Sequence, residues 1–589
     1  MLHFKIDKIM KIKKEEIMLA LAAMFSLSSV PGCTIAKAAD PEDSDAVFAY
    51  REIYLPESTG SNAHKLGLNS LDTDWGIWGH NLRNILPEEP SLSVYAEQDG
   101  TTYHSQFCFS SQKLFDYVED YIDSKYDSDE HIRFAILPND NGIVCLCSDC
   151  EEIGNTKRNA SPAVFEFINK LSKRFPNHLF FTSYYRTTQG LPKDTLPQNV
   201  GVLVSAIDYP LSSAPTPKEQ QFLDVLNTWK KKTGSIFVWD YINDFDDYLT
   251  PYPIFDVMQR RLKLYADNGV NSVFLNGSGT DYSTFSELKA DMLAALTANP
   301  DIDWRPLLKE KAKEYYPTAG DVISDFIIAQ EDFVKANGKE LPLYDGVAKA
   351  LQTYLPKDQF IAFHDSLLEL RPQTSGKERK YLDRLLGALA MTRLELNRID
   401  GITTDSKKYL DDLAYLQRED IVNYNEAGWV IDRFIRDYNI LLNHYDNANK
   451  NNLLKGKKLE ALTPLDPDYS NIGILTDGML GIPSNYHDGN LIMSPEVYSR
   501  IAIPNDQHLK HLRVGLVLNP AYKIDLPEEI SLFSGGKEIA TVIPSYPADN
   551  SGHAFVDFDI PSSAQGSLVL TLIKKQDSKS MAIDEIEGW

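Results

Sequence analysis

The sequence has few cysteines and a shortage of positive charge, and both features narrow what the protein does. Only five of its 589 residues are cysteine, and 59 basic side chains face 84 acidic ones, a formal net charge of −25. A nucleic-acid partner requires a basic face, so the charge balance argues against one. The chain also lacks a G-x-S-x-G elbow, an H-E-x-x-H motif and a G-x-G-x-x-G turn after a strand. These absences argue against an esterase, a zinc peptidase and a dinucleotide-binding sheet.

Long apolar runs are missing as well, and the one near the N-terminus is too short for a membrane-spanning helix. Lys11, Lys13 and Lys14 precede the apolar residues 17–25, and small residues then lead to Cys33. This order predicts a lipoprotein-type export leader over residues 1–39. We expect an exported protein, anchored to the membrane through lipidated Cys33, in the periplasm or on the outer-membrane surface. Pro31 is unusual before a lipidated cysteine, so plain cleavage near residues 36–39 is the alternative.

Composition and length indicate a globular protein with several cores, since 43% of residues are hydrophobic and 11% aromatic. Residues 46–300 alternate strand-like runs with amphipathic helical stretches, a pattern typical of a parallel sheet covered by helices. This length favours a (β/α)8-type (TIM) barrel, and a complete and an incomplete barrel both remain open. The expected strands are residues 46–52, 93–95, 132–137, 179–185, 201–207, 235–241 and 272–275.

The remaining chain changes character twice. Residues 301–446 contain long helical patterns with charged faces, which predict a helical bundle. Residues 465–589 contain short alternating runs separated by Gly, Pro, Asn and Asp, which predict an antiparallel β-sandwich. The predicted fold class is therefore multidomain, α/β followed by α and then β.

Two carboxylates at predicted strand ends are the candidates for catalysis. Asp140 follows the strand 132–137 and Asp240 lies at the end of the strand 235–241. Barrel enzymes carry their chemistry at the carboxyl ends of strands. Glycoside hydrolysis needs two carboxyl groups, one on each side of the scissile bond. Each aspartate has an alternative role as a cap of the next helix or turn.

Other polar and aromatic residues near the strand ends suit a carbohydrate. Aromatic faces stack on the apolar faces of sugar rings, and carboxylates bind hydroxyl groups. We expect Trp78, Tyr184 and Trp239 to form the walls, with Trp75, Trp78 and His80 in the loop WGIWGHN. His80 has the alternative role of bracing its loop, and Glu52 and Asp208 are reserve carboxylates. The candidate substrate-binding residues are Arg51, Glu52, Trp78, His80, Asn139, Tyr184, Asp208, Trp239, Tyr241 and Asn276.

Four cysteines form a second signal. Cys145, Cys147 and Cys150 are closely spaced, and Cys108 lies upstream. Four thiols suit a structural zinc site, and in an exported protein they also suit disulfides. We expect either arrangement to brace the loop that carries Asp140, since no strand–C-x-x-C–helix context for redox chemistry is present.

Several segments together resemble one family. The runs YREIYLPE, WGIWGHN, SQFCFSS, LPNDNGIVCLCSDC, VWDY and VFLNGSG resemble the domain of unknown function numbered 4838, which is similar to barrel glycoside hydrolases such as α-glucuronidases and hexosaminidases. The resemblance implies a (β/α)8-type barrel that acts on glycans. Members usually carry further chain before the YRE run, which is the reason for expecting an incomplete barrel. The family motifs fall on Arg51, Glu52, Trp78, His80, Cys108, Asn139, Asp140, Cys145, Cys147, Cys150, Trp239 and Asp240.

The C-terminal part resembles a galactose-binding-like, discoidin-type sandwich. The segments ILTDGMLG and LRVGLVLNPAYKIDLPEEISLFSGG and the final AIDEIEGW carry this likeness. It implies a module that binds carbohydrate through loops at one end, with a structural calcium in some members. A purely architectural role is the alternative.

The sequence thus predicts an exported glycoside hydrolase that acts on an oligo- or polysaccharide. Asp140 would protonate the leaving-group oxygen, Asp240 would be its partner, and no cofactor would take part in catalysis. The alternative is a non-catalytic, glycan-binding surface lipoprotein on a degenerate barrel.

Overall fold

The structure is a computed structural model that describes residues 46–401, 405–417, 422–447, 451–488, 490–548 and 552–589. The predicted leader 1–39 and Cys33 lie outside these residues. The described chain forms two compact units, which we call the barrel unit (46–243 and 252–341) and the sandwich unit (244–251 and 342–589). The helical segment 301–446 is divided between them. No helix in the described ranges is long and apolar enough to cross a membrane.

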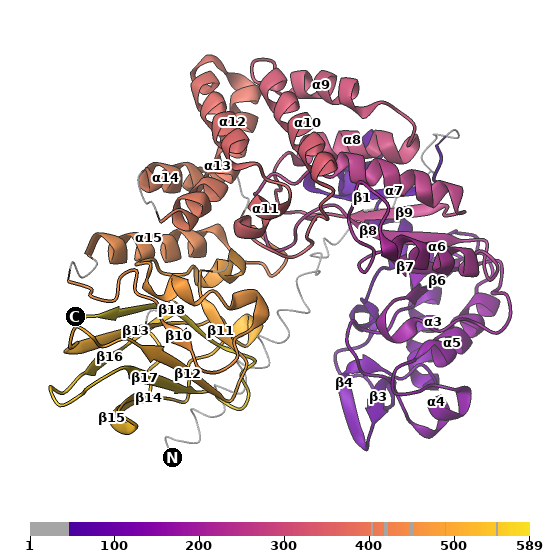
Figure 1. The fold of residues 1–589 in the computed structure, drawn as a ribbon. Helices are drawn as coiled ribbons and strands as arrows, with labels where there is room; N and C mark the ends of the chain where they lie inside the picture. Colours follow the sequence, from indigo (N-terminus) through magenta and orange to yellow (C-terminus); the bar gives the residue numbers. More distant parts are fainter. Residues whose placement is uncertain (1–45, 402–404, 418–421, 448–450, 489, 549–551) are drawn as a thin grey trace. The chain divides into compact units, whose positions relative to one another are not determined.

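The barrel unit is built on a sheet of seven parallel strands in the order β1-β9-β8-β7-β6-β5-β2. Figure 1 labels β1, β9, β8, β7 and β6 of this sheet. Each strand is buried on both faces, which explains why most appear in the sequence as continuous apolar runs. The strands are β1 (Tyr50–Tyr54), β2 (Trp75–Ile77), β5 (Arg133–Ala135), β6 (Leu179–Tyr184), β7 (Val200–Ser205), β8 (Ile236–Tyr241) and β9 (Ser272–Asn276).

This sheet is an incomplete barrel, because β1 and β2 are its two edges and no ladder joins them among the described residues. Side chains connect the two edges instead. The indole Nε1 of Trp75 in β2 donates a hydrogen bond of 2.8 Å to the hydroxyl of Tyr50 in β1. Phe181, Phe237 and Phe274 pack with these two rings in the interior. The predicted fold class is confirmed, with the barrel in its incomplete form.

Helices cover the outer face of the sheet. Val164, Phe167 and Ile168 of one such helix are buried with Phe134 and Phe180 of the strands. The helices of this unit are α2 (Leu71–Asp74), α3 (Gln112–Lys125), α4 (Ser148–Ile153), α5 (Ser161–Arg174), α6 (Pro217–Trp229), α7 (Phe255–Asp267), α8 (Ser286–Ala298), α9 (Trp304–Tyr315) and α10 (Gly320–Asn337).

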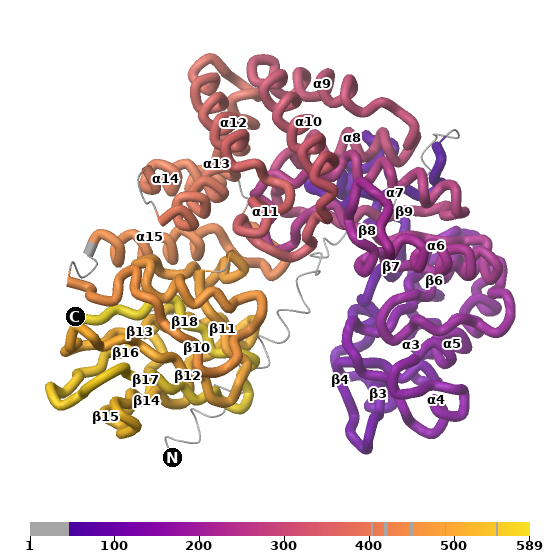
Figure 2. Tube along the Cα trace, in the orientation of Figure 1, coloured from indigo at the N-terminus to yellow at the C-terminus, as the bar shows by residue number. Residues whose placement is uncertain are grey.

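Two local predictions for this unit were wrong. The run 93–95 does not enter the sheet: it leads into β3 (Tyr95–Gln98), which forms an antiparallel hairpin with β4 (Thr101–Phe107), traced in Figure 2. Conversely, Trp75–Ile77 was assigned to a loop and is the edge strand β2. A strand of three residues is too short to show a periodicity.

The sandwich unit contains a helical part and an antiparallel part. Its helices are α11 (Val347–Thr353), α12 (Lys357–Leu370), α13 (Gly376–Ile399), α14 (Ser406–Gln417) and α15 (Ile431–Asn447). One sheet has the order β10-β12-β17-β14-β15 and the other β11-β18-β13-β16. The strands are β10 (Glu460–Ala461), β11 (Ile492–Ser494), β12 (Tyr498–Ile503), β13 (His511–Val517), β14 (Glu529–Ser534), β15 (Lys537–Val542), β16 (His553–Asp559), β17 (Leu568–Ile573) and β18 (Met581–Gly588). Side chains of both sheets form one core, as expected for a sandwich.

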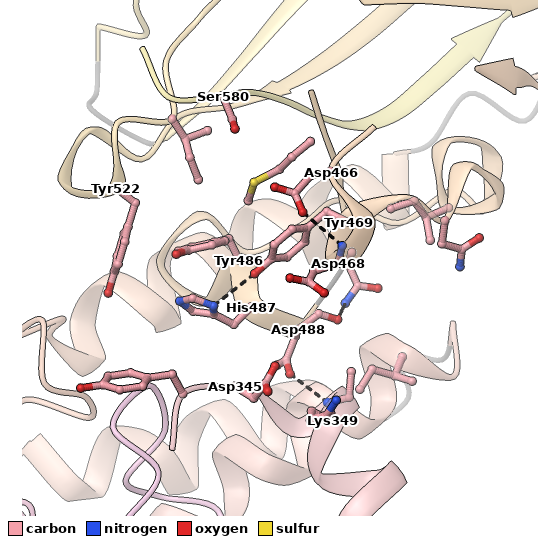
Figure 3. A pocket seen from close by; sticks show the side chains of 18 of the residues that line it. Asp345, Lys349, Asp466, Asp468, Tyr469, Tyr486, His487, Asp488, Tyr522 and Ser580 are labelled. Carbon is pink, nitrogen blue, oxygen red and sulfur yellow. Dashed lines mark hydrogen bonds between the residues drawn. The ribbon is translucent and has the colours of Figure 1, made fainter. Parts of the chain in front are cut away.

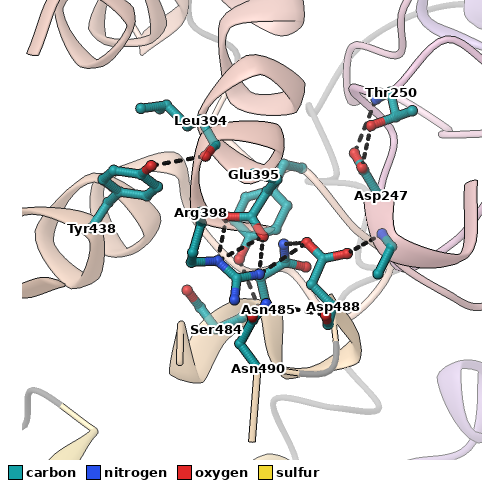
Figure 4. A network of polar contacts seen from close by, with 12 residues as sticks. Asp247, Thr250, Leu394, Glu395, Arg398, Tyr438, Ser484, Asn485, Asp488 and Asn490 are labelled. Carbon is teal, nitrogen blue, oxygen red and sulfur yellow. Dashed lines mark hydrogen bonds and ion pairs between the residues drawn. The ribbon is translucent and has the colours of Figure 1, made fainter. Parts of the chain in front are cut away.

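A buried ionic network ties the helices of this unit to its loops (Figure 4). The guanidinium of Arg398 in α13 bonds the carboxylate of Glu395 and lies 3.4 Å from that of Asp488, and all three side chains are fully buried. Asp488 also accepts hydrogen bonds from the side chain of Asn485 and the backbone N–H of Ala348 at the start of α11. The loop before β11 is thereby fixed against two helices.

Candidate functional site

The carboxyl ends of the parallel strands bring together residues from loops that are far apart in sequence. In β8, Phe237 and Trp239 pack in the barrel interior, so Tyr241 shares their inward direction. In β9 the same alternation gives Asn276 the direction of Phe274, and Asn276 is paired with Tyr241 across the two strands. Tyr241 and Asn276 therefore lie together at the carboxyl ends of the parallel strands, which we call the site edge of the sheet and where both residues were expected.

Two tryptophans form a stacked pair at this edge. The rings of Trp78 and Trp239 are 5.1 Å apart and inclined by 15°, and Phe274 contacts both of them edge-on. Trp78 follows β2 and Trp239 lies in β8, and these two strands are not neighbours in the sheet. The sheet must therefore curve for the two rings to meet. Two of the three aromatic side chains predicted as walls are thus adjacent.

Asp140 lies beside two residues that the sequence prediction did not select. Its carboxylate is 2.7 Å from the Nε of Arg186, and the two side chains are 43% and 52% exposed. The same Nε donates to the hydroxyl of Tyr185. The pKa of Arg186 is raised, first by its hydrogen bond to Tyr185 and then by the charges of Asp140 and Asp208. Asp140 and Asp208 therefore both act on one guanidinium, and Asp208 is exposed as well.

The backbone of Arg186 supports a functional reading of this cluster. Its φ of 44° is in the left-handed region, which a residue with a long side chain rarely adopts. Such conformations persist where the surrounding structure imposes them, and they are found often in active sites. Tyr185 and Arg186 directly follow β6, and this position at the end of a parallel strand is the feature of the sequence that identifies them as candidate site residues.

His80 and Asn139 hold the loop that carries Asp140. The Nδ1 of His80 lies 2.5 Å from the carbonyl oxygen of Pro138, and burial lowers the pKa of this histidine. The side-chain amide of Asn139 donates to the carbonyl of Ser105 in β4. Gln106 of the same strand donates to the carbonyl of Asn139 and accepts from its backbone N–H. Both predicted binding residues are thus engaged with the protein itself in this structure.

The structure does not place Asp240 where a substrate reaches it. Its side chain is fully buried, with Oδ1 bonded to Arg261 and Oδ2 to the hydroxyl of Tyr265, both in α7. Because Trp239 points into the barrel, the next residue must point to the helices. Asp240 therefore fixes α7 on β8, and its pairing with Asp140 as a catalytic partner is not what this geometry favours.

Tyr184 and Arg51 also point away from the site edge. Tyr184 packs edge-on against Trp229 of α6, with ring centres 6.1 Å apart, and so does not form a wall of the site. Arg51 is 3% exposed and donates to the carbonyl of Gly67. Side chains alternate between the two faces of a strand. The neighbour of Tyr184, Ser183, and the neighbour of Arg51, Glu52, therefore point into the barrel in their place.

Glu52 points into the barrel and is nearly inaccessible. It is 3% exposed, accepts a hydrogen bond from the hydroxyl of Tyr50 and accepts another from the backbone N–H of Leu71 at 2.7 Å. Burial raises the pKa of Glu52 well above its usual value. This carboxyl helps to join the two edges of the sheet through Tyr50 and Trp75.

The four cysteines meet in one cluster, as expected. The sulfur atoms of Cys108, Cys145, Cys147 and Cys150 all lie within 4.8 Å of one another, and all four thiols are free. Cys108 is 3.7 Å from Cys147 and 3.7 Å from Cys150, too far for a disulfide. The cluster could hold a metal ion. Hairpin β3–β4 is tied to the same loop, since the backbone N–H of Leu146 donates to the carbonyl of Glu97.

These features define the class of the barrel unit: an incomplete α/β barrel with aromatic and charged side chains at the carboxyl ends of its strands. Residues 43–327 match the family model described as Domain of unknown function (DUF4838). The family resemblance is therefore confirmed for this segment. No curated protein matches the chain.

Solved structures show weaker likenesses. The chain is similar to BtGH115A, a family GH115 4-O-methyl-α-glucuronidase with specificity for decorated arabinogalactans, at 12% identity and a TM-score of 0.42, over 92% of this chain and 81% of that one. It is similar to a GH138 enzyme targeting pectin rhamnogalacturonan II, at 8% identity and a TM-score of 0.32, over 85% of this chain and 79% of that one. A lectin domain of lectinolysin in complex with Lewis B antigen covers 24% of this chain and 98% of its own, at 14% identity and a TM-score of 0.19.

Proposed function

We propose that the barrel unit is a glycoside hydrolase with Asp140 as its general acid and Asp208 as the partner carboxylate. The observation that carries this proposal is the group formed by Asp140, Tyr185 and Arg186, which lies at strand ends together with the Trp78–Trp239 pair. Both aspartates are exposed and both act on the guanidinium of Arg186. Two carboxylates near one cation supply the acid and the base or nucleophile that glycoside hydrolysis needs.

The remaining side chains have defined tasks in this proposal. Trp78 and Trp239 offer to a sugar ring the aromatic faces that are not stacked on each other. Tyr241 and Asn276 offer hydrogen bonds to its hydroxyl groups. Arg186 holds the carboxylate of Asp140 in place until a glycan enters and displaces the guanidinium; Asp140 then takes up a proton from solvent and transfers it to the leaving-group oxygen. His80 and Gln106 keep the loop fixed beneath it.

A panel of oligosaccharides and aryl glycosides tests the proposal, with release of reducing ends as the readout. Asp140→Asn should lower turnover of natural linkages by about 10²–10⁴-fold, the usual contribution of a general acid. It should retain turnover of aryl glycosides whose leaving group needs no proton. Asp194→Asn, an exposed aspartate outside the site, is the matched control. Equal loss on both substrate types would remove Asp140 from the acid role, and an intact panel with the native chain would refute hydrolysis.

The second candidate function is glycan binding without turnover. The specific observation in its favour is the burial of Asp240, which leaves the predicted catalytic pair incomplete. In that case the native chain binds glycans through Trp78 and Trp239 but releases no product. Trp239→Ala would then weaken binding about tenfold, while Asp140→Asn would leave it unchanged.

We further propose that the cysteine cluster holds a structural zinc ion. Four sulfurs at about 2.3 Å from zinc in a tetrahedron lie about 3.8 Å apart, close to the 3.7 Å found here between Cys108 and two of its partners. Metal analysis of the purified chain should give one zinc per protein, and Cys150→Ser should lose it. A pair of disulfides, detected by mass after thiol blocking, would contradict zinc.

Export and anchoring remain part of the proposal. The leader at 1–39 would direct secretion and Cys33 would carry the lipid. Labelling with a fatty acid should depend on Cys33 and disappear in Cys33→Ser. The calcium expected in the sandwich from its likeness also stays a prediction, checked by the same metal analysis.

A further inference from the structure

The sandwich unit contains a cavity that none of the predicted site residues lines (Figure 3). Its volume is about 880 Å³, within the range of pockets that bind small molecules. One wall comes from α11 and the turn before it. The others come from the loop before β11, the turn after β13 and the residues that precede β18. The buried pair of Arg398 and Asp488 lies at its base, where Asp488 is part of the lining.

Aromatic side chains form one side of the cavity. The rings of Tyr469 and Tyr522 lie 5.9 Å and 4.9 Å from that of Tyr486, and His487 packs 3.8 Å from Tyr486. The hydroxyl of Tyr469 is 3.2 Å from Nδ1 of His487. Burial lowers the pKa of His487 to about 4, aided by the charge of Lys579. Nε2 of His487 lies 3.2 Å from Oδ2 of Asp246, whose pKa burial raises to about 8, so near pH 7 this contact joins a neutral imidazole to a mostly protonated carboxyl. The aromatic side is therefore uncharged.

Tyr486 offers a buried polar group to the cavity. The residue is 8% exposed and lines the cavity, and its hydroxyl forms no hydrogen bond within the described part of the chain. Burial raises the pKa of this phenol, which keeps it protonated. A hydroxyl that opens to a cavity and has no partner in the described chain is available to a ligand or to water. This group points to a ligand with a hydrogen-bonding function.

Carboxylates also line the cavity, and they exceed the cations. Five aspartates and two lysines line the cavity, the aspartates at positions 345, 466, 468, 477 and 488 and the lysines at 349 and 579. Asp488 is balanced by Arg398. Asp345 and Asp468 form no ion pair in the described part of the chain. Burial raises the pKa of Asp345, the charge of Lys349 lowers it, and the charge of Asp468 raises it. Tyr469 lies among three of these carboxylates, whose charges raise its pKa after burial does.

We propose that this cavity binds a protonated amine on a hydroxyl-rich framework, that is, an amino sugar. Aromatic faces and carboxylates together attract a cation, the first by the ring quadrupole and the second by charge. The hydroxyl of Tyr486 and the amides of Asn471 and Asn490 would meet the hydroxyl groups of the ring. The surplus of carboxylates would repel a uronic acid. The proposal concerns the sandwich unit alone and does not depend on hydrolysis by the barrel unit.

Calorimetric titration of the full chain tests it with three probes of equal length: a fully deacetylated chitotetraose, its N-acetylated counterpart and a glucuronate-containing tetrasaccharide. We expect the amine-bearing probe to bind at least tenfold more tightly than the acetylated one, with an affinity that falls as salt increases. The uronate probe should bind weakest. Equal or tighter binding of the neutral or acidic probe overturns the proposal, as does the absence of binding by the amine.

Variants locate the binding in this cavity. Asp468→Asn should weaken the amine-bearing probe about tenfold or more, and Tyr486→Phe, which keeps the ring, about threefold to tenfold. Glu496→Gln removes an exposed carboxylate from the same unit outside the lining and should change nothing. Circular dichroism checks that each variant is folded. If Asp468→Asn does not fold, Tyr486→Phe alone tests whether the probe binds in this cavity. Unchanged affinity in the folded variants overturns the assignment, even if the barrel unit hydrolyses glycans.

Discussion

Each unit buries an arginine against carboxylates, and the two networks leave very different surroundings. In the barrel unit, Arg261 and Tyr265 satisfy both oxygens of Asp240, and the carboxylates left at the site edge are exposed beside Arg186. In the sandwich unit, Arg398 serves both Glu395 and Asp488, and the cavity above it keeps more acid than base. Complete burial with all partners present marks a structural carboxylate. A carboxylate that faces solvent or a cavity without a matching cation is the one available to a ligand.

We expect the largest loss of folding stability from replacing Arg398. Arg398→Met leaves two buried carboxylates without their cation, and breaking a buried ion pair costs about 3–5 kcal/mol. Arg261→Met strands only Asp240, which keeps the hydrogen bond from Tyr265. We therefore expect urea unfolding to show a greater loss for the first variant. Equal losses of unfolding free energy in the two variants would contradict this expectation. They would mean that the number of carboxylates left without a cation does not determine the destabilisation.

The two aspartates of the barrel unit should separate stability from activity. Asp240→Asn leaves Arg261 buried without a counter-charge, which should cost about 3 kcal/mol. Asp140→Asn loses an exposed ion pair, which contributes about 0–1 kcal/mol, and should lose hydrolysis instead. Thermal unfolding and turnover of both variants measure this contrast. A stable but inactive Asp240→Asn would restore Asp240 as a catalytic group.

Acid should destabilise the sandwich unit through His364. This histidine is fully buried, and burial together with Arg393 and Lys408 lowers its pKa to about 3. Because the folded pKa lies below the unfolded value of about 6.5, the unfolded chain binds more protons between these pH values, and stability falls as pH falls through that window. Between pH 7 and pH 5 the loss should be about 2 kcal/mol.

His364→Phe removes the proton site and keeps an aromatic ring beside Phe360 and Tyr409. The loss of stability between pH 7 and pH 5, measured by urea unfolding, should then be about 2 kcal/mol smaller than in the native chain. The matched change in the barrel unit, His178→Phe, should alter the pH dependence less, because a backbone hydrogen bond to Glu130 and the charge of Glu130 oppose the lowering of the His178 pKa by burial. A larger effect at His178 would contradict this order.

The smallest effect concerns Gly346, next to the base of the cavity. A Cβ added there would lie 2.0 Å from Oδ1 of Asp488, which is held by Asn485 and Ala348. Gly346→Ala should cost about 1 kcal/mol through overpacking and weaken amine binding. Gly234→Ala, where an added Cβ meets nothing within 4 Å, is the control. Similar behaviour of the two variants would show that the loop moves freely.

The architecture could be predicted from the sequence, because strands buried on both faces and sandwich strands have distinct patterns. The direction of single side chains could not. The run 235–241 is apolar on both faces, so nothing local shows that Trp239 points inward and Asp240 toward α7; the partner that settles it, Arg261, comes 21 residues later. The direction of Tyr184 could not be predicted either: it points to α6, and the next residue, Tyr185, reaches the site. The cavity of the sandwich unit was missed because its walls come from α11 and from loops more than 100 residues further along the chain.

The register of the barrel sheet has a consequence for the order in which the chain is made. β1 pairs only with β9, Tyr50 with Ser272, among the described strands. At translation rates of roughly 5–20 residues per second, the first strand waits about 10–45 s before its partner exists. For that time its apolar face and its free backbone groups are open to wrong partners. The earliest described strand therefore has no strand to pair with until most of the barrel unit has been synthesised.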